Sequence, residues 1–196
     1  MKYSFFALIS RLRNISRWSL MRNTSHENVQ EHSHMVAVIA HALAVIRRDV
    51  FKQDADPNKE AVLALFHDAS EIFTGDLPTP VKYFDPDIMT AYKRVESVAS
   101  GKLLAALPKE LRGAYTELLP SDGKNETSEI VKAADKLAAL IKCLEELKSG
   151  NQEFGLAAEQ SRAKLSALSM PEVDYFIRHF IPAFELTLDE LDFSME

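Results

Sequence analysis

The chain has a single cysteine, Cys143, among its 196 residues, so no disulfide can form within it. That suits a reducing compartment, and we expect a cytoplasmic location. No apolar run approaches the roughly 18–20 residues that span a bilayer, and Arg11 and Arg13 interrupt the short apolar stretch at the amino end. We therefore expect no membrane partner and no signal peptide.

Positive charge is also in short supply. Lys and Arg number 23 against 29 Asp and Glu, for a net charge of −6, and the basic residues are scattered. A nucleic-acid polymer favours a basic stripe, so we expect no such partner. A protein of this charge that handles a phosphate needs positive charge concentrated locally, by a metal ion or a few basic side chains.

Glycine is scarce, and apolar residues recur at steps of three and four, which is typical of amphipathic helices. No strand pattern or internal repeat is present. We predict an all-α fold, with residues 1–196 forming one domain. The expected helices cover residues 28–49, 58–73, 87–107, 110–119, 127–149, 152–168 and 171–180. The prolines and glycine of 75–80 break the pattern, and 121–125 resembles a turn.

Ionisable side chains stand within otherwise apolar helix patterns. They are His32, the adjacent pair His67 and Asp68, and Asp135. Such groups are costly to bury unless they are paired or bind a metal. Imidazole and carboxylate together suit Mn, Co, Fe, Zn or a similar divalent ion. Two histidines and two aspartates also leave coordination positions open, as in a catalytic site. A lone His-Asp pair is usually a surface dipeptide, so the ordered set on separate helices carries the prediction of one divalent ion.

This ordered set resembles the signature of the HD-domain metal-dependent phosphohydrolases, whose fold is an all-helical bundle. Further motifs resemble the bacterial 5′-deoxynucleotidases within that family: Arg17-Trp18, residues 31–33, 67–71, 75–84 and 144–147. The similarity covers nearly the whole chain and is weakest around 50–58 and 120–127. It implies hydrolysis of deoxyribonucleoside 5′-monophosphates with Co, Mn or a similar ion, and it implies a homodimer.

Glu71 follows His67 by four residues and Asp68 by three, so a continuous helix would place it on their face. It could orient water, relay a proton or hold a metal ligand, or it could be a solvated glutamate near a helix end. The resemblance implies a catalytic acid/base role for Glu71. It also implies that Asp68 contacts substrate as well as metal.

Spacing alone does not select among the four arginines near the amino end, at 11, 13, 17 and 22. The resemblance selects Arg17, whose guanidinium suits phosphate oxygens in binding and catalysis. Trp18 would by itself be read as a core or rim aromatic. The resemblance makes it the wall that disfavours a 2′-hydroxyl.

The segment from Asp76 through Leu77 and Pro78 to Thr79 could be a simple connector with Asp76 as a cap. The resemblance implies a nucleotide-binding loop. Lys82 could add charge near a phosphate or lie on the surface.

The remaining candidates favour a structural interpretation. His34 and His41 share a helix face that points roughly 200° away from His32. Cys143 has no evident activating partner and is better explained as a small buried hydrophobe. Two alternative functions stay open: another HD-type hydrolase acting on an alarmone, a cyclic dinucleotide or a triphosphate, and a non-catalytic, metal-stabilised helical interaction module.

Overall fold

The computed structural model describes residues 2–82, 84–119 and 128–191. Within these ranges the chain forms helices and one isolated bridge, between Ser16 and Asn28, so the predicted all-α fold is confirmed. The α-helices are α1 (Phe5–Ile9), α2 (Val29–Val45), α3 (Pro57–Phe66), α4 (Glu71–Thr74), α5 (Thr79–Lys82), α6 (Pro86–Ala105), α7 (Lys109–Tyr115), α8 (Glu129–Lys148), α9 (Gly155–Ser166) and α10 (Pro171–His179). Shorter turns are η1 (Ser10–Asn14), η2 (Ile46–Val50, a π turn), η3 (Gln152–Phe154), η4 (Ile181–Glu185) and η5 (Leu188–Glu190).

Local capping sets where the site-bearing helices begin. The Asn28 side chain accepts a hydrogen bond from the Glu31 amide at 3.0 Å, and the Glu31 carboxylate accepts one from the Asn28 amide at 3.2 Å. This reciprocal pair satisfies two backbone donors at the start of α2, one turn before His32. The Asp56 side chain caps α3 by accepting from the Lys59 amide at 3.1 Å, and Pro57 occupies the first turn of this helix.

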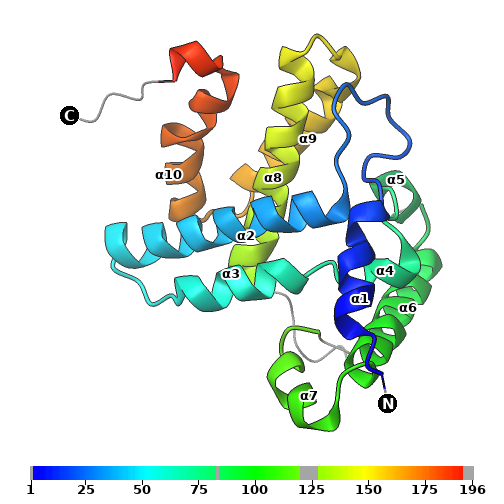
Figure 1. Cartoon of the computed structure of the whole chain (residues 1–196). Helices are drawn as coiled ribbons and strands as arrows, with labels where there is room; N and C mark the ends of the chain where they lie inside the picture. Colours follow the sequence, from blue (N-terminus) through cyan, green and yellow to red (C-terminus); the bar gives the residue numbers. More distant parts are fainter. Residues whose placement is uncertain (1, 83, 120–127, 192–196) are drawn as a thin grey trace.

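The main core lies where α2 packs against both α3 and α8 (Figure 1). Val36, Leu43 and Leu137 are fully buried there. Helix α9 packs along α8, and α10 contacts α2. The elements that carry His32 and Asp135 therefore cross within the best-packed part of the molecule.

A second apolar cluster joins α1 to α6. Phe5, Leu103 and Leu107 form its centre, and Ala69 belongs to it. Ala64, five residues earlier, belongs to the main core. The segment with His67 and Asp68 thus runs from one core to the other and is held at both ends. No helix in the described ranges is long and apolar enough to cross a membrane.

The predicted continuous helix over 58–73 is wrong at its centre. Helix α3 ends at Phe66, turns cover 67–70, and α4 begins at Glu71. The cause is local: the Ala64 carbonyl, which a helix would pair with the Asp68 amide, instead lies 2.7 Å from the His67 ring Nδ1. Turn bonds follow, with the Glu71 amide donating to the Asp68 carbonyl at 2.9 Å.

The predicted interruption at 75–80 is shorter than expected. Gly75 has a φ of 71°, which favours glycine and ends α4. Thr79 already begins α5, so the predicted loop is in fact a loop followed by one helical turn. The turn expected at 121–125 lies outside the described residues, and α8 begins at Glu129.

Candidate metal and nucleotide site

The His67 ring is oriented for metal binding. Its Nδ1 lies 2.7 Å from the Ala64 carbonyl, which can only accept, so Nδ1 carries the hydrogen. The other ring nitrogen, Nε2, is buried and makes no well-aligned hydrogen bond, although the Asp68 Oδ2 lies 3.1 Å from it. A backbone carbonyl that fixes the tautomer and leaves Nε2 for a cation is the usual support for a metal-binding histidine.

The other predicted ligands meet this nitrogen. Ligand atoms of His32, His67 and Asp135 all lie within 4.8 Å of one another, which makes them a candidate metal group. The Asp135 Oδ1 is 3.1 Å from His32 Nε2. The Asp68 Oδ2 is 3.1 Å from His67 Nε2 and 3.7 Å from His32 Nε2. The structure therefore brings together all four side chains selected from sequence, and this donor set fits a divalent ion.

Electrostatics show that the cluster favours a cation. Burial lowers the pKa of His67, but the adjacent Asp68 carboxylate raises it more, to about 9. Burial raises the pKa of Asp68, yet its cationic neighbours, His67 first, hold it well below its ordinary range. The pKa of Asp135 is likewise lowered, since its hydrogen bond with His32 outweighs burial. Two ionised carboxylates, with side chains 20% exposed for Asp68 and 41% for Asp135, thus lie beside the buried His32 imidazole.

Arg17 is the one arginine of the amino-terminal group that reaches this cluster. Its side chain is 12% exposed, and Nη1 lies 3.6 Å from the Asp68 Oδ2. Arg11, Arg13 and Arg22 are exposed. Burial lowers the pKa of Arg17, but Asp68 and other carboxylates raise it more, so the guanidinium stays charged beside the cluster.

Glu71 is buried rather than solvated. Its Oε2 has no hydrogen-bond partner. Burial, followed by the nearby Asp68 and Asp76 carboxylates, raises the pKa of Glu71 to about 10. The group therefore holds a proton at neutral pH, as a general acid requires.

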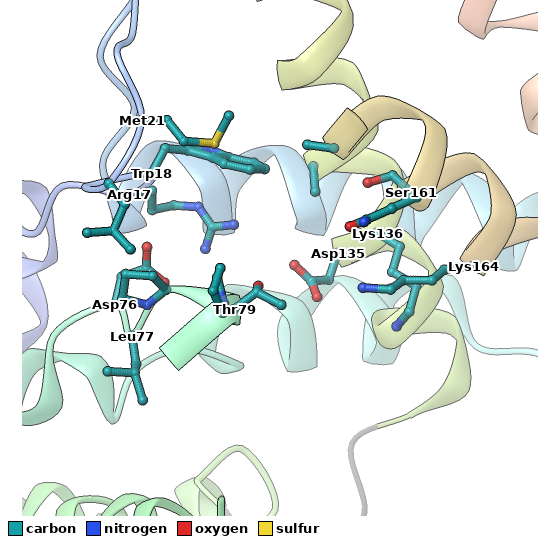
Figure 2. A pocket seen from close by; sticks show the side chains of 16 residues that line it. Arg17, Trp18, Met21, Asp76, Leu77, Thr79, Asp135, Lys136, Ser161 and Lys164 are labelled. Carbon is teal, nitrogen blue, oxygen red and sulfur yellow. The ribbon is translucent and has the colours of Figure 1, made fainter. Parts of the chain in front are cut away.

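A cavity of about 930 Å³ opens beside the cluster (Figure 2). Its wall includes every predicted nucleotide-binding residue except Asp68: Arg17, Trp18, Asp76, Leu77, Pro78 and Thr79. Asp135 lines it as well. In Figure 2 the Arg17 guanidinium lies under the Trp18 indole, with Asp76 below them. The cavity therefore unites the metal group with the proposed substrate residues.

A smaller cavity of about 290 Å³ touches the other side of the cluster. His67, Asp68 and Asp135 line it, together with Lys82. The Lys82 ammonium lies 3.4 Å from the Glu96 carboxylate and over the Tyr92 ring. Lys82 is thus near the cluster but already engaged with α6.

The sequence did not reveal the residues of α8 and α9 that line the main cavity, nor the role of Glu27 beside it. Lys136, Ser161 and Lys164, on α8 and α9, face Arg17 and Trp18 across the cavity in Figure 2, and Gln160 also lines it. Glu27 accepts hydrogen bonds from Arg17 and Trp18. None of these residues belongs to a motif, and only their neighbourhood in space reveals them.

The residues interpreted as structural are away from the site. His34 and His41 lie exposed on α2. Cys143 is fully buried, and burial raises the pKa of its thiol to about 11, so it behaves as a hydrophobe.

A family model described as YfbR-like 5′-deoxynucleotidase matches residues 4–184. The chain belongs to this family. The 5′-deoxynucleotidases of Vibrio parahaemolyticus and Cronobacter sakazakii are 48% and 50% identical to it. Each alignment covers 95% of the chain, with 97% and 94% of the respective relative. Among solved structures, an HD-domain phosphohydrolase from Listeria innocua superimposes with a TM-score of 0.79 at 26% identity, over 92% of this chain and 88% of that one. The resemblance read from the motifs is confirmed for the family and the fold.

Proposed function

We propose that the chain is a 5′-deoxynucleotidase that hydrolyses deoxyribonucleoside 5′-monophosphates to a deoxynucleoside and orthophosphate. The observation that carries this proposal is the position of the metal group beside the cavity. His67 Nε2 is a buried ligand atom, and Asp135 belongs both to that group and to the cavity lined by Arg17 and Trp18. Membership of the family supports the substrate class.

In this proposal His32, His67, Asp68 and Asp135 hold one divalent ion. When bound, such an ion supplies positive charge for the phosphate and lowers the pKa of water beside it. Arg17 binds the phosphate oxygens and balances the charge that develops as water attacks phosphorus in line with the leaving O5′. Its buried position, 3.6 Å from Asp68, supports this role.

Glu71 provides the proton in the same step. The water oxygen bonds to phosphorus, the P–O5′ bond breaks, and the leaving O5′ takes the proton from the Glu71 carboxyl. One proton of the attacking water then passes to the Glu71 carboxylate and restores the acid. Its raised pKa, about 10, supports a donor role. Asp68 contacts both the ion and the phosphate.

The nucleoside lies between Trp18 and the segment from Asp76 through Leu77 and Pro78 to Thr79. All of them line one cavity. The Trp18 indole packs on Phe154 with ring centroids 5.3 Å apart, which makes it a firm wall. We assign to Trp18 the exclusion of the 2′-hydroxyl, and hence the deoxy preference.

The test is a panel of ribo- and deoxynucleoside 5′- and 3′-monophosphates with Mn²⁺, Co²⁺ or Mg²⁺, in which orthophosphate release is measured. We expect turnover of the deoxy 5′-monophosphates and much less of the others. Pyrophosphate or a linear ester as the product from other substrates would favour a different HD-type hydrolase. If metal raised the melting temperature while no phosphate ester turned over, the interaction module would replace this proposal.

We propose the domain organisation, oligomeric state, metal ion and location from separate observations. Residues 1–196 act as one domain, since the segment at 67–71 joins both cores. The chain forms a homodimer, and the exposed Ile88, Val95 and Val98 of α6 offer an apolar face.

We propose Co or Mn as the ion and the cytoplasm as the location, the latter from the single cysteine. Light scattering and metal analysis of purified protein test the mass and the ion.

A further inference from the structure

The segment from Ile15 to Val29 is a closed loop whose two ends pair with each other. The Arg17 amide donates to the Glu27 carbonyl at 3.0 Å, and the Val29 amide donates to the Ile15 carbonyl at 3.0 Å. Arg17 and Trp18 therefore sit at one stem of a loop, and Glu27 sits directly opposite them. The loop leads straight into α2 and His32.

One carboxylate oxygen in this stem accepts hydrogen bonds from Arg17 and Trp18, the two side chains of this loop that we propose to contact substrate. The Glu27 Oε2 accepts a hydrogen bond from the Arg17 Nε at 3.1 Å and from the Trp18 indole Nε1 at 2.9 Å. Glu27 and Arg17 are 16% and 12% exposed, so water competes little for these bonds. A charge-assisted bond in such surroundings fixes orientation more firmly than a neutral one.

Trp18 needs such a restraint because its backbone is unusual. Its φ of 58° lies in the left-handed region, which is uncommon for a bulky residue. The surrounding structure must hold that conformation. The Trp18 carbonyl accepts from the Met21 amide and from the Asn23 side chain, and the indole is held by Glu27 at one end and Phe154 on its face.

We propose that Glu27 is a positioning residue that sets Arg17 and Trp18 as one unit, so that phosphate binding and discrimination against the 2′-hydroxyl depend on the same carboxylate. The inference rests on the proposed function for the roles of Arg17 and Trp18. Glu27 does not line the cavity, and its part is to hold the guanidinium and the indole at a fixed mutual angle. A shift of the indole would open space for a ribose, and a shift of the guanidinium would weaken phosphate binding.

The experiment compares Glu27→Ala and Glu27→Gln with the wild type, and with Glu159→Gln as a control that removes one exposed carboxylate on α9. We measure kcat and KM for dAMP and AMP with Mn²⁺. Glu27→Ala should raise KM for dAMP and reduce the dAMP-to-AMP ratio of kcat/KM by about tenfold. Glu27→Gln keeps one acceptor and should fall between, and Glu159→Gln should match the wild type.

Trp18 is the only tryptophan, so its fluorescence reports on this loop without reference to activity. In Glu27→Ala the emission should shift to the red and acrylamide quenching should increase. A double-mutant cycle with Trp18→Phe, which cannot donate to Glu27, should show that the two substitutions do not add in their effect on the dAMP-to-AMP ratio.

The inference fails if Glu27→Gln and any folded Glu27→Ala protein keep the wild-type ratio and Trp18 emission, or if the cycle is additive. A change in melting temperature alone, with both readouts unchanged, also overturns it, because it would show only a structural contact. Failure of the proposed function is seen separately, in a wild-type chain that releases no orthophosphate or prefers AMP. The emission of Trp18 then still decides whether Glu27 positions it.

Discussion

Among the described residues, two clusters that contain buried charged side chains differ in how completely their polar atoms are satisfied. In the metal group, His32 Nδ1 and His67 Nε2 have no hydrogen-bond partner. In the other cluster, which we call the anchor (Lys142, Glu146 and their partners), the fully buried Glu146 accepts from five donors. Burial raises the pKa of Glu146, but these donors, Lys142 first, hold it far below its ordinary range.

The difference distinguishes a group of residues that can bind an ion from a group that only holds the structure in place. Buried polar atoms are nearly always paired, so atoms left unpaired call for an explanation such as an ion. The anchor has no such requirement: Thr24 and Ser25 donate to Glu146, and Lys142 donates to the Ser25 carbonyl and to Glu146. It ties the far end of the 15–29 loop to α8, while the near end carries Arg17. The metal group would do the chemistry, and the anchor keeps its neighbours in place.

The largest expected effect comes from the metal group. Asp68→Asn should lower kcat/KM for dAMP by about a thousandfold or more, roughly 4 kcal/mol of transition-state stabilisation, because it removes a ligand and a charge partner of Arg17. In EDTA, the free energy of unfolding should fall as well, because the carboxylate charge that pairs with His67 and Arg17 is lost. Steady-state kinetics and urea unfolding measure the two quantities. Asp54→Asn, at an exposed carboxylate, is the control, and equal losses in both variants would contradict the prediction.

Substitution in the anchor should act mainly on the free energy of unfolding. Glu146→Ala leaves the Lys142 ammonium buried without its carboxylate and also frees the Thr24 and Ser25 amides, so the free energy of unfolding should fall by about 3 kcal/mol. Urea unfolding measures it. Glu145→Ala, at the exposed neighbour on α8, should cost far less. Similar losses for the two glutamates would show that the anchor contributes nothing particular.

The sequence selected the four side chains that the structure brings together in the metal group, but it did not reveal the contacts of the anchor, although Glu146 lies in the 144–147 motif. Each predicted metal ligand stands out locally, as an ionisable residue in an apolar helix pattern, and the motifs resemble those of the family. Lys142 and Glu146 look like an ordinary (i, i+4) surface pair, and their partner Thr24 is 122 residues away from Glu146. Glu27 was missed likewise, since the turn that pairs it with Arg17 leaves no periodic signal.

The same reasoning explains the error at 67–70. The apolar spacing of α3 continues past Phe66, so periodicity predicts one helix. What ends it is the bond between the His67 ring and the Ala64 carbonyl, a side-chain competition that spacing does not reveal. The bond that breaks the helix also aims Nε2 at the other ligands.

The stabilisation by added metal should distinguish the metal group from the anchor, and it should be intermediate in size among the expected effects. Adding Mn²⁺ or Co²⁺ at about a hundred times its dissociation constant should stabilise the stripped protein by about 2.7 kcal/mol. Thermal melts measure this as a rise in Tm. His67→Ala should abolish the rise, whereas Glu146→Gln should lower Tm and still show it. A rise that persists in His67→Ala would place the ion elsewhere.

The smallest expected effect is on the pH dependence of the metal-stripped protein, and here the clusters should have opposite signs. The pKa of His67 is raised to about 9 in the folded chain, above its ordinary 6.5. The stability it contributes is therefore complete below pH 6.5 and lost as pH rises toward 9. The raised pKa of Glu71, about 10, acts in the same direction, because folding disfavours its ionised form.

In EDTA, the free energy of unfolding should therefore fall as pH rises from 6 to 9, by up to about 1.4 kcal/mol per pH unit for each of the two groups. Glu146, whose pKa is lowered, contributes stability that is present above pH 4.5 and lost only in acid. Urea unfolding across this range should show a slope that His67→Ala reduces and Glu146→Gln leaves intact. If Glu146→Gln reduced this slope instead, the assignment of the pH dependence to His67 would be wrong.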